Sequence, residues 1–204
     1  DGRSSAAGLK YLLLGAISAA VTLYGMAVRF GLSGSTSLDE IASAVRSADG
    51  DTRSALVLAA VFLMAGFGFK MAIVPFQMWV PDVYEGAPTP VAAYLSVGSK
   101  AAGFAVVMRV FLTALGDGSI SSDWANVFAA LAAVSMSLGN LTALMQGNIK
   151  RMLGYSSIAQ AGTFLIGLAA VAAADPQLLL GTSSVVFFLG TYAFTNLGAF
   201  IAVI

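Results

Sequence analysis

Long apolar stretches alternate with short polar connections along most of this 204-residue chain. Six of these stretches are about 20 residues long or longer, the length that an α-helix needs to cross the hydrocarbon layer of a bilayer. They are Leu9 to Phe30, Ser54 to Trp79, Pro90 to Leu115, Trp124 to Gln146, Tyr155 to Ala174 and Leu178 to Ile204. They lack the alternation of apolar and polar residues that marks strands of a membrane β-barrel. The pattern predicts an all-α fold, a polytopic transmembrane helix bundle with six spanning helices.

We expect residues 1–204 to form a single transmembrane domain that is a fragment of a longer protein. The first residue is Asp1 instead of Met, and the last apolar stretch is still running at Ile204. The sequence therefore indicates truncation at both ends.

One connection, Gly31 to Arg53, is long and polar. Within it, Ser37 and Glu40 have the spacing of a capping box, in which each side chain bonds to the backbone N–H of the other residue. The residues that follow place Leu38, Ile41, Ala42 and Val45 on one helical face. We predict a short amphipathic helix over residues 37–47 that lies at the membrane surface.

Six crossings place alternate connections on opposite sides of the membrane. The connection Pro81–Thr89 shares one side with Arg3, Lys10, Lys150 and Arg151. The opposite side holds the long connection and Asp117, Asp123 and Asp175. Because short cytoplasmic loops are enriched in Lys and Arg, the first side is predicted to be cytoplasmic, or stromal in a plastid.

Composition excludes several classes of protein. Hydrophobic residues make up 58% of the chain and charged residues 10%, the formal net charge is zero, and the mean hydropathy is +0.88. These values exclude a disordered chain, a nucleic-acid binder and an ordinary water-soluble domain. Because the chain has no Cys and no His, disulfides, Cys-ligated metals and the commonest general base are excluded. Any chemistry must use Lys, Arg, Asp, Glu and the backbone.

Two lysines lie deep inside predicted spans. Lys100 follows Pro90 by ten residues, and Lys70 lies between Ser54 and Pro81. Ten helical residues rise roughly 15 Å, half of the hydrocarbon thickness, so we expect both ammonium groups to be buried near the midplane. Intramembrane charges are costly and usually mark an ion or proton path. The alternative is that each lysine caps backbone carbonyl groups.

Lysine suits a proton relay because burial disfavours its charged form, so that a neighbouring charge can make it take up or release a proton. Arginine stays charged at any accessible pH. Arg109, near the end of its predicted span, is therefore interpreted as a structural anchor.

A proline interrupts the second span. Pro75 has no N–H to donate and its ring clashes with the carbonyl group of Met71, next to Lys70. Broken helices at membrane depth line water or ion sites in transporters. We predict a helix broken at Pro75, and a simple kink relieved by packing is the alternative.

Three sequence motifs carry a resemblance to a known family. Residues 69–90 read FKMAIVPFQMWVPDVYEGAPTP, residues 95–100 read LSVGSK, and residues 148–162 read NIKRMLGYSSIAQAG. The chain resembles the antiporter-like subunits of respiratory complex I, and within them the subunit N family of NADH-quinone oxidoreductase. The related L and M subunits and sodium/proton antiporters typically have His at the position of Lys100.

The resemblance implies two inverted repeats of five helices, each with a broken helix, of which this chain would hold the sixth to eleventh helices of about fourteen. It implies that Lys70 and Lys100 are the channel lysines of the family. A glutamate on helix five and a charged residue on helix twelve would lie outside the chain. Pro75, Gln77, Asp82, Glu85 and Lys150 are candidates for structural or proton-path support.

Two positions depart from the family pattern, because Gln77 and Gln160 stand where relatives often carry His. Glutamine cannot titrate, so Gln77 is not expected to carry protons. Asp82 is expected to cap the backbone of its loop or of the following helix.

The function that the resemblance implies is proton translocation by a membrane subunit of an NADH-quinone oxidoreductase. The expected partners are other complex I membrane subunits and the lipid bilayer, with no nucleic acid. NADH, FMN, iron–sulfur clusters and quinone are expected in partner subunits, and no cofactor or metal in this chain. The expected location is a bacterial inner membrane, or a thylakoid membrane. A stand-alone sodium/proton antiporter subunit and a structural spacer are the alternatives.

Overall fold

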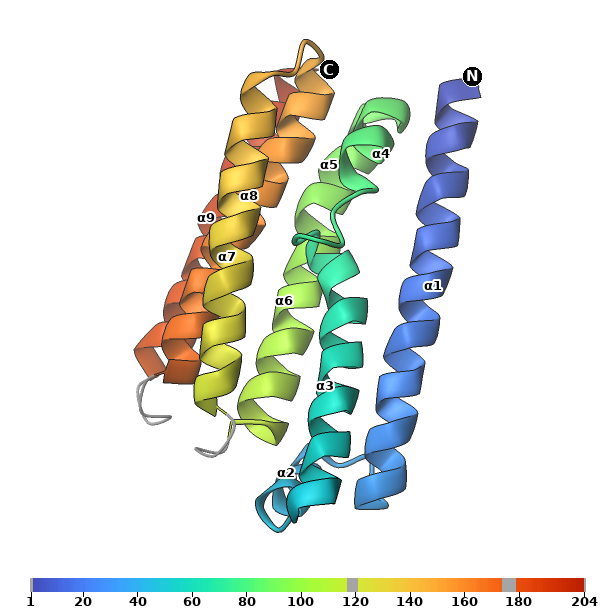
Figure 1. Cartoon of the computed structure of the whole chain (residues 1–204). Coiled ribbons are helices and arrows are strands. Elements are labelled where there is room, and N and C mark those ends of the chain that lie inside the picture. Colours follow the sequence, from blue (N-terminus) through green and yellow to red (C-terminus); the bar gives the residue numbers. More distant parts are fainter. Residues whose placement is uncertain (1, 117–120, 174–178, 204) are drawn as a thin grey trace.

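The computed structural model describes residues 2–116, 121–173 and 179–203, which are helical over most of their length (Figure 1). The helices are α1 (Gly2–Ser33), α2 (Leu38–Arg46), α3 (Gly50–Met71), α4 (Val80–Gly86), α5 (Thr89–Tyr94), α6 (Lys100–Arg109), α7 (Ser121–Leu144), α8 (Ile149–Ala173) and α9 (Leu179–Ile201). Two π-helical turns, η1 (Leu95–Ser99) and η2 (Val110–Ala114), join α5, α6 and the end of the third span into one continuous rod.

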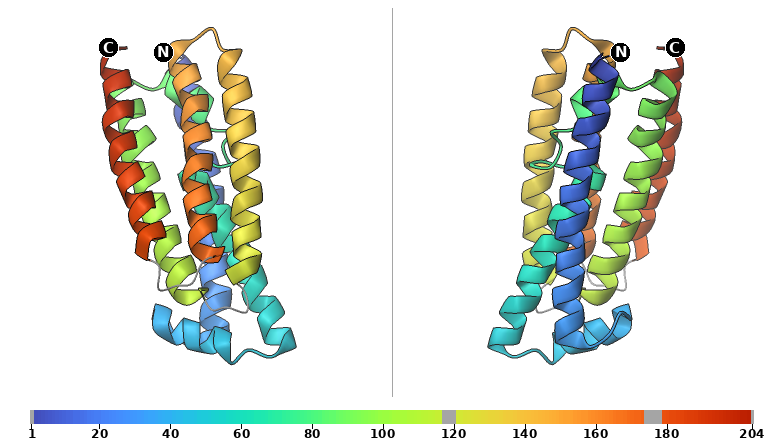
Figure 2. Two further views of the ribbon diagram at one scale, coloured as in Figure 1. Left: turned by 90° about the vertical axis from the view of Figure 1, so that its left-hand side faces the viewer. Right: turned by 90° about the vertical axis from the view of Figure 1, so that its right-hand side faces the viewer.

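The prediction of an all-α bundle with six spanning helices is confirmed. Six helical segments are long and apolar enough to cross a membrane, and the described ranges contain no strand. These segments are Gly2–Ser33, Gly50–Met71, Thr89–Ala114, Trp124–Leu144, Ile149–Ala173 and Gly181–Ile201. Two views at right angles to Figure 1 show the long helices running side by side along the bundle (Figure 2).

The second span differs from its predicted bounds. Helix α3 ends at Met71, whereas the apolar pattern extended the span to Trp79. Residues 72–79 are not helical, and the short helix α4 follows them at the end of the bundle (Figure 1). Hydropathy does not separate helical from unwound apolar backbone, which explains the difference.

Connections alternate between the two ends of the bundle as expected. The N-terminus, α4 and the connection between α7 and α8 lie at one end, and α2 lies at the other (Figure 1). Asp117 and Asp175 lie outside the described residues, as does the side chain of Asp123. Which end faces the cytoplasm stays a prediction.

Helix α2 forms close to the predicted 37–47 range. Ser37 is its N-cap residue, but the Ser37 side chain makes no capping hydrogen bond, so the expected capping box is not present. The predicted apolar face is largely buried, through Ile41, Ala42 and Val45. It packs against η2 and α1, while the position of α2 at a membrane surface stays a prediction.

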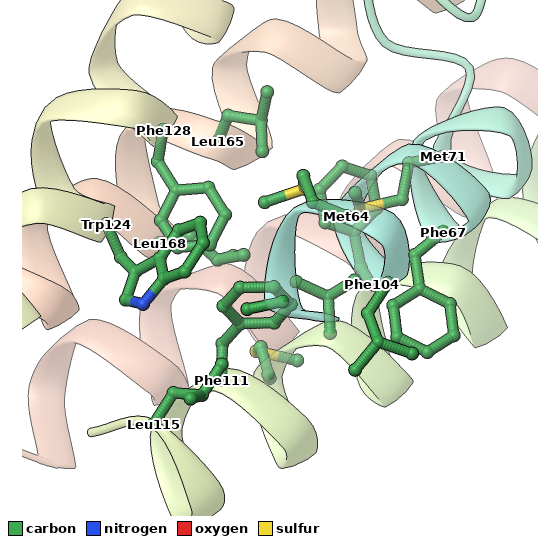
Figure 3. Packing of buried hydrophobic residues seen from close by; sticks show 14 of the residues in the cluster. Met64, Phe67, Met71, Phe104, Phe111, Leu115, Trp124, Phe128, Leu165 and Leu168 are labelled. Atoms are coloured by element: carbon green, nitrogen blue, oxygen red, sulfur yellow. The ribbon is translucent and has the colours of Figure 1, made fainter. Parts of the chain in front are cut away.

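The core lies where α3, α6, α7 and α8 meet (Figure 3). Aromatic rings pack edge-on or tilted there, with ring centroids 4.9 Å apart for Phe104 and Phe164 and 5.0 Å for Phe111 and Trp124, the geometry that aromatic quadrupoles favour. Outward positions of the long helices are also apolar, as Leu12 (66% exposed) and Phe194 (84% exposed) show. Such a surface suits lipid or further helices.

Helices α7 and α8 approach closely because glycine stands at their contact. A Cβ atom at Gly139 would lie 2.6 Å from the backbone nitrogen of Ala159. Small residues allow this backbone approach in lipid, where van der Waals packing drives helix association. Helix α4 packs against α8 of this pair and against α1.

Candidate functional site

The second span breaks at the residue where α3 ends. Ala72 adopts the left-handed conformation with φ of 61°, and the N–H groups of Ala72 and Ile73 donate to the carbonyl oxygens of Phe69 and Gly68, each at 3.2 Å. The predicted break is confirmed, although it begins three residues before Pro75, which lies exposed in the unwound segment after a cis peptide bond. Lys70 thus lies in the last turn of a helix that ends inside the bundle.

Side chains and local turns satisfy the unwound backbone. The N–H group of Val74 donates to Ser135 Oγ on α7 at 3.0 Å. The indole Nε1 of Trp79 donates to the Phe69 carbonyl oxygen at 3.0 Å. A turn closes between the Phe76 N–H and the Ile73 oxygen at 2.7 Å. Because unpaired backbone groups are costly when buried, these bonds hold residues 72–79 in a defined path.

Lys100 is the most deeply buried charged side chain of the described residues, with 1% of its surface exposed. It stands at the junction between the π-helical turn η1 and helix α6. Its Nζ donates to the carbonyl oxygen of Ser157 at 2.5 Å and also to the Ser157 hydroxyl. The Tyr84 hydroxyl lies 3.3 Å from the same Ser157 oxygen. Lys100 of α6 and Tyr84 of α4 therefore both contact Ser157 on α8, whose neutral oxygens hold the ammonium group.

Further buried polar groups extend this cluster toward α9. Asn196 Nδ2 donates to Ser96 Oγ at 2.5 Å, and the Ser96 hydroxyl donates to the Ala93 carbonyl oxygen at 2.7 Å. Tyr192, also on α9, has a buried hydroxyl with no partner among the described residues. Sequence reasoning missed Ser157, Ser96 and Asn196, because single small polar residues inside apolar stretches carry no distinctive signal.

Lys70 lies in a different environment from Lys100. Its side chain is exposed and lines a hollow of about 780 Å³ between α1 and α3, beside Gly8, Tyr11 and Gly15. The expectation of a buried ammonium group is confirmed for Lys100 and is wrong for Lys70 in the described part of the chain. Sequence depth along a helix does not specify which helical face a residue occupies.

The helices that carry the two lysines nevertheless touch. A Cβ atom at Gly103, one turn after Lys100, would lie 3.2 Å from the Cβ of Lys70. Helices α3 and α6 are therefore in close contact beside both residues. Lys70 faces the α1 side of this contact and Lys100 the α8 side.

Ion pairs clamp α4 to α1 and α8 at the end of the bundle that holds the N-terminus. Asp82 accepts hydrogen bonds from Lys10 on α1 and, at 2.7 Å, from Arg151 on α8. Arg151 also contacts Glu85 at 3.0 Å. Burial favours a higher pKa for Asp82, but the hydrogen bonds and charges of Lys10 and Arg151 outweigh it and lower the pKa. The expected backbone cap is wrong, because the Asp82 carboxylate is engaged by cations from distant parts of the chain.

Lys150 supports the same junction through backbone contacts. Its Nζ donates to the carbonyl oxygens of Glu85 at 3.1 Å and Ala87 at 2.5 Å. These oxygens lie at the C-terminal end of α4, where helix carbonyl groups lack intrahelical partners. Lys150 thus caps α4, whereas a part for it in the proton path stays a prediction.

Gln77 lies in the unwound segment with a buried Oε1 that has no partner among the described residues. It lines a hollow of about 330 Å³ together with Asp82, Thr142, Arg151 and Tyr155. The hollow is large and polar enough for ordered water, which needs two to four polar partners. Within the described ranges, no group of three His, Cys, Asp or Glu residues could hold a metal ion.

Comparisons with known proteins agree with the sequence motifs. Residues 1–204 match the family described as NADH:quinone oxidoreductase/Mrp antiporter, TM. The chain is 54% identical to NAD(P)H-quinone oxidoreductase subunit 2 of Rippkaea orientalis, covering 100% of this chain and 38% of that protein. It is 50% identical to NADH-quinone oxidoreductase subunit N of Moorella thermoacetica, covering 99% and 40% of the two chains. The chain thus spans about two fifths of the length of these relatives.

A solved structure agrees with these matches in fold. A chain of respiratory complex I from Thermus thermophilus with bound aureothin superposes with a TM-score of 0.77 at 38% identity. The match covers 98% of this chain and 40% of that one. The resemblance indicated by residues 69–90, 95–100 and 148–162 is therefore confirmed over essentially the whole chain.

Proposed function

The chain belongs to the transmembrane family of NADH:quinone oxidoreductases and Mrp antiporters, and we propose that it is part of a proton-carrying membrane subunit of a quinone oxidoreductase. The observation that carries the proposal is Lys100, whose buried ammonium group is held by the carbonyl oxygen and the hydroxyl of Ser157. The relatives named subunit 2 and subunit N support the choice of enzyme.

The surroundings of Lys100 suit a group that exchanges a proton. A buried cation without a carboxylate partner is poised so that an approaching charge changes its protonation. Ser157 and Tyr84 carry hydroxyl groups, which can both donate and accept. A proton that leaves Lys100 can therefore pass to the Ser157 hydroxyl on α8, which lies beside the Tyr84 hydroxyl on α4.

Lys70 would be a second group that takes up and releases a proton, on the opposite side of the α3–α6 contact. Lys70 lines the hollow between α1 and α3, and Gln77, in the unwound residues 72–79, lines the second hollow. Ordered water in the two hollows would hydrate Lys70 in the first and Gln77 in the second. Gln77 would hold that water through its unpartnered Oε1 and would not itself titrate.

The redox chemistry would belong to partner subunits. NADH or another electron donor, FMN, iron–sulfur clusters and quinone would be bound there, and other membrane subunits would flank this one in the bilayer. The membrane would be the inner membrane of a bacterium, or the thylakoid membrane if the host is cyanobacterial or plastid-bearing. Charge changes that accompany quinone reduction would pass along the membrane subunits and drive proton transfer at Lys100.

The alternative function, a stand-alone sodium/proton antiporter subunit, would have the same family and fold. Two observations favour the quinone oxidoreductase subunit over it. The curated relatives at 50% and 54% identity are named as quinone oxidoreductase subunits. Lys100 also stands where the antiporters typically carry His. A structural spacer would not need a buried ammonium group at the junction of three helices.

The proposal is tested with the full-length protein that contains this segment, purified through a tag under conditions that keep complexes intact. We expect it to copurify with redox subunits, and vesicles containing the assembly to take up protons when an electron donor and quinone are added. Sodium-driven proton exchange by a complex without redox subunits would show the antiporter function instead.

A further inference from the structure

Arg29 is a buried arginine that the proposed proton path does not use. It lies near the C-terminal end of α1, with 3% of its surface exposed. This end of the bundle also holds α2 and is opposite to the ion pairs of Asp82 (Figure 1). Helix α1 reaches the connection 34–37 one turn after Arg29, and the Ser33 hydroxyl donates to the Arg29 carbonyl oxygen at 2.8 Å.

The guanidinium group of Arg29 lacks a counter-charge in the described part of the chain. Its Nε and Nη2 are buried and have no hydrogen-bond partner there. The acidic residues of the neighbouring helix α2, Asp39 and Glu40, are exposed on the face opposite to its buried residues. Arginine cannot escape burial by losing its proton, and an unpaired buried cation is strongly unfavourable. An anion from outside the described residues is therefore needed at this position.

A cavity of about 190 Å³ adjoins the guanidinium group. Its polar lining, besides Arg29, consists of Ser35 and Thr36 in the connection between α1 and α2. Ser35 Oγ already accepts a hydrogen bond from the Ser37 N–H at 3.0 Å, so its hydroxyl proton is free to be donated. Thr36 is exposed, which places the polar mouth of the cavity at the end of the bundle.

The other walls of the cavity are apolar and continue onto the outer surface. Met26 and Phe30 line the cavity and are 47% and 52% exposed on α1. Leu38 and Ile41 of α2 and Phe67 of α3 close the opposite side. A ligand that fits must combine one anionic group with an apolar chain that can lie along α1. A free phosphate ion would leave the apolar walls uncovered.

We propose that this cavity binds the phosphate group of an anionic phospholipid, with Arg29 as its counter-charge and an acyl chain along Met26 and Phe30. The guanidinium group matches phosphate geometry through paired N–H donors. Hydroxyl groups of Ser35 and Thr36 lie at the mouth to complete the contacts. The lipid would neutralise Arg29 and fasten α2 to the end of α1.

The test uses the full-length protein in its assembled complex, placed in phosphatidylcholine nanodiscs that contain a photoreactive phosphatidylglycerol analogue. Cross-linked peptides are mapped by mass spectrometry. We expect labelling within residues 26–41, reduced by about tenfold or more in Arg29→Gln and less strongly in Arg29→Lys. Arg109→Gln is the matched control, because Arg109 is an exposed arginine in another span that does not line the cavity.

A second variant and two competitors make the test decisive. Thr36→Trp narrows the mouth while keeping Arg29, and is expected to lower labelling even if Arg29→Gln does not assemble. Excess unlabelled phosphatidylglycerol should compete, whereas inorganic phosphate should not. Competition by phosphate would show a free-anion site. Absent labelling in the wild type would point to a carboxylate from another part of the protein, and equal labelling of wild type, Arg29→Gln and Thr36→Trp would overturn the proposal.

Discussion

Lys100 on α6 donates from Nζ to the carbonyl oxygen of Ser157 on α8 at a distance of 2.5 Å, inside the core. A carbonyl oxygen has two lone pairs, so the Ser157 oxygen can accept this bond while α8 remains an uninterrupted helix over Ile149–Ala173. The Ser157 hydroxyl is a second acceptor for the same ammonium group. Helix α8 therefore fixes the position of the Lys100 side chain. The Lys100 ammonium group donates its hydrogen bonds to neutral oxygens of Ser157.

The hydroxyl of Ser157 is predicted to contribute to proton transfer beyond its structural effect. Ser157→Ala removes one acceptor and the contact with Tyr84, but keeps the carbonyl oxygen, so we expect about 1 kcal/mol of lost stability. Proton uptake per quinone reduced should fall in the assembled complex. Ser156→Ala, at the adjacent, half-buried position, is the control and should keep the wild-type ratio. An unchanged ratio in Ser157→Ala would remove this hydroxyl from the path.

The indole of Trp79 is predicted to stabilise the break in the second span. Trp79→Phe leaves the Phe69 carbonyl oxygen without its side-chain donor, at a cost of about 1–3 kcal/mol. Trp124→Phe is a close control, since the buried Nε1 of Trp124 has no partner among the described residues. Thermal unfolding of the purified complex measures both variants. Equal destabilisation would mean that ring packing, and not the hydrogen bond, fixes residues 72–79.

Acid is predicted to weaken the clamp around Asp82. The hydrogen bonds and charges of Lys10 and Arg151 outweigh burial and lower its pKa in the folded state. A lowered pKa gives stability that is complete above the unfolded value of about 3.9 and is lost as pH falls through the folded value. Because Asp82 is 34% exposed, the contribution should stay below about 1 kcal/mol. Unfolding measured from about pH 6 down to about pH 2 should show this loss in the wild type.

Two variants complete the Asp82 prediction. Asp82→Asn should flatten the acid-dependent change in stability, whereas Asp39→Asn, at an exposed position on α2, should not. We also expect Asp82→Asn to retain proton pumping, because its ion pairs connect helices instead of carrying protons. An assembled Asp82→Asn complex that does not pump would contradict this structural role.

The topology is predicted to place α4 and the α7–α8 connection on the cytoplasmic side, with α2 opposite. The chain has no natural cysteine, so single cysteines can be placed by Pro88→Cys, Gly147→Cys and Ser47→Cys at exposed positions. An impermeant thiol reagent added from the cytoplasmic side should label the first two and not the third. Labelling of Pro88→Cys and Gly147→Cys from opposite sides would be incompatible with the six-span arrangement.

Hydropathy was sufficient to predict the bundle because each span exceeds the bilayer thickness, a constraint that is local in sequence. Hydropathy gave the wrong end for the second span, because mostly apolar residues continue through 72–79 after helix α3 has ended. Pro75 indicated a break but could not locate its start, since Ala72 is an ordinary helix former by type. The left-handed conformation of Ala72 depends on the surrounding fold.

The candidate site was predictable in part for a similar reason. A lysine ten residues into a span has to be deep, and Lys100 is buried as expected. Lys70 is equally deep in sequence, but its helical face is set by the packing of α1 and α3. The partners of Asp82, Lys10 and Arg151, are 72 and 69 residues away, so local capping rules could not find them.

The central claim is that Lys100 relays protons, and its most direct test is proton uptake driven by an electron donor in vesicles that contain the assembled complex. Lys100→Ala removes the titratable group, and Lys100→Arg keeps a charge that cannot release its proton. We predict that both variants pump poorly, that quinone reduction slows with them, and that Lys70→Ala and Lys70→Arg behave in the same way. Arg109→Ala should pump normally. A fully assembled Lys100→Ala complex that pumps at the wild-type rate would contradict the account.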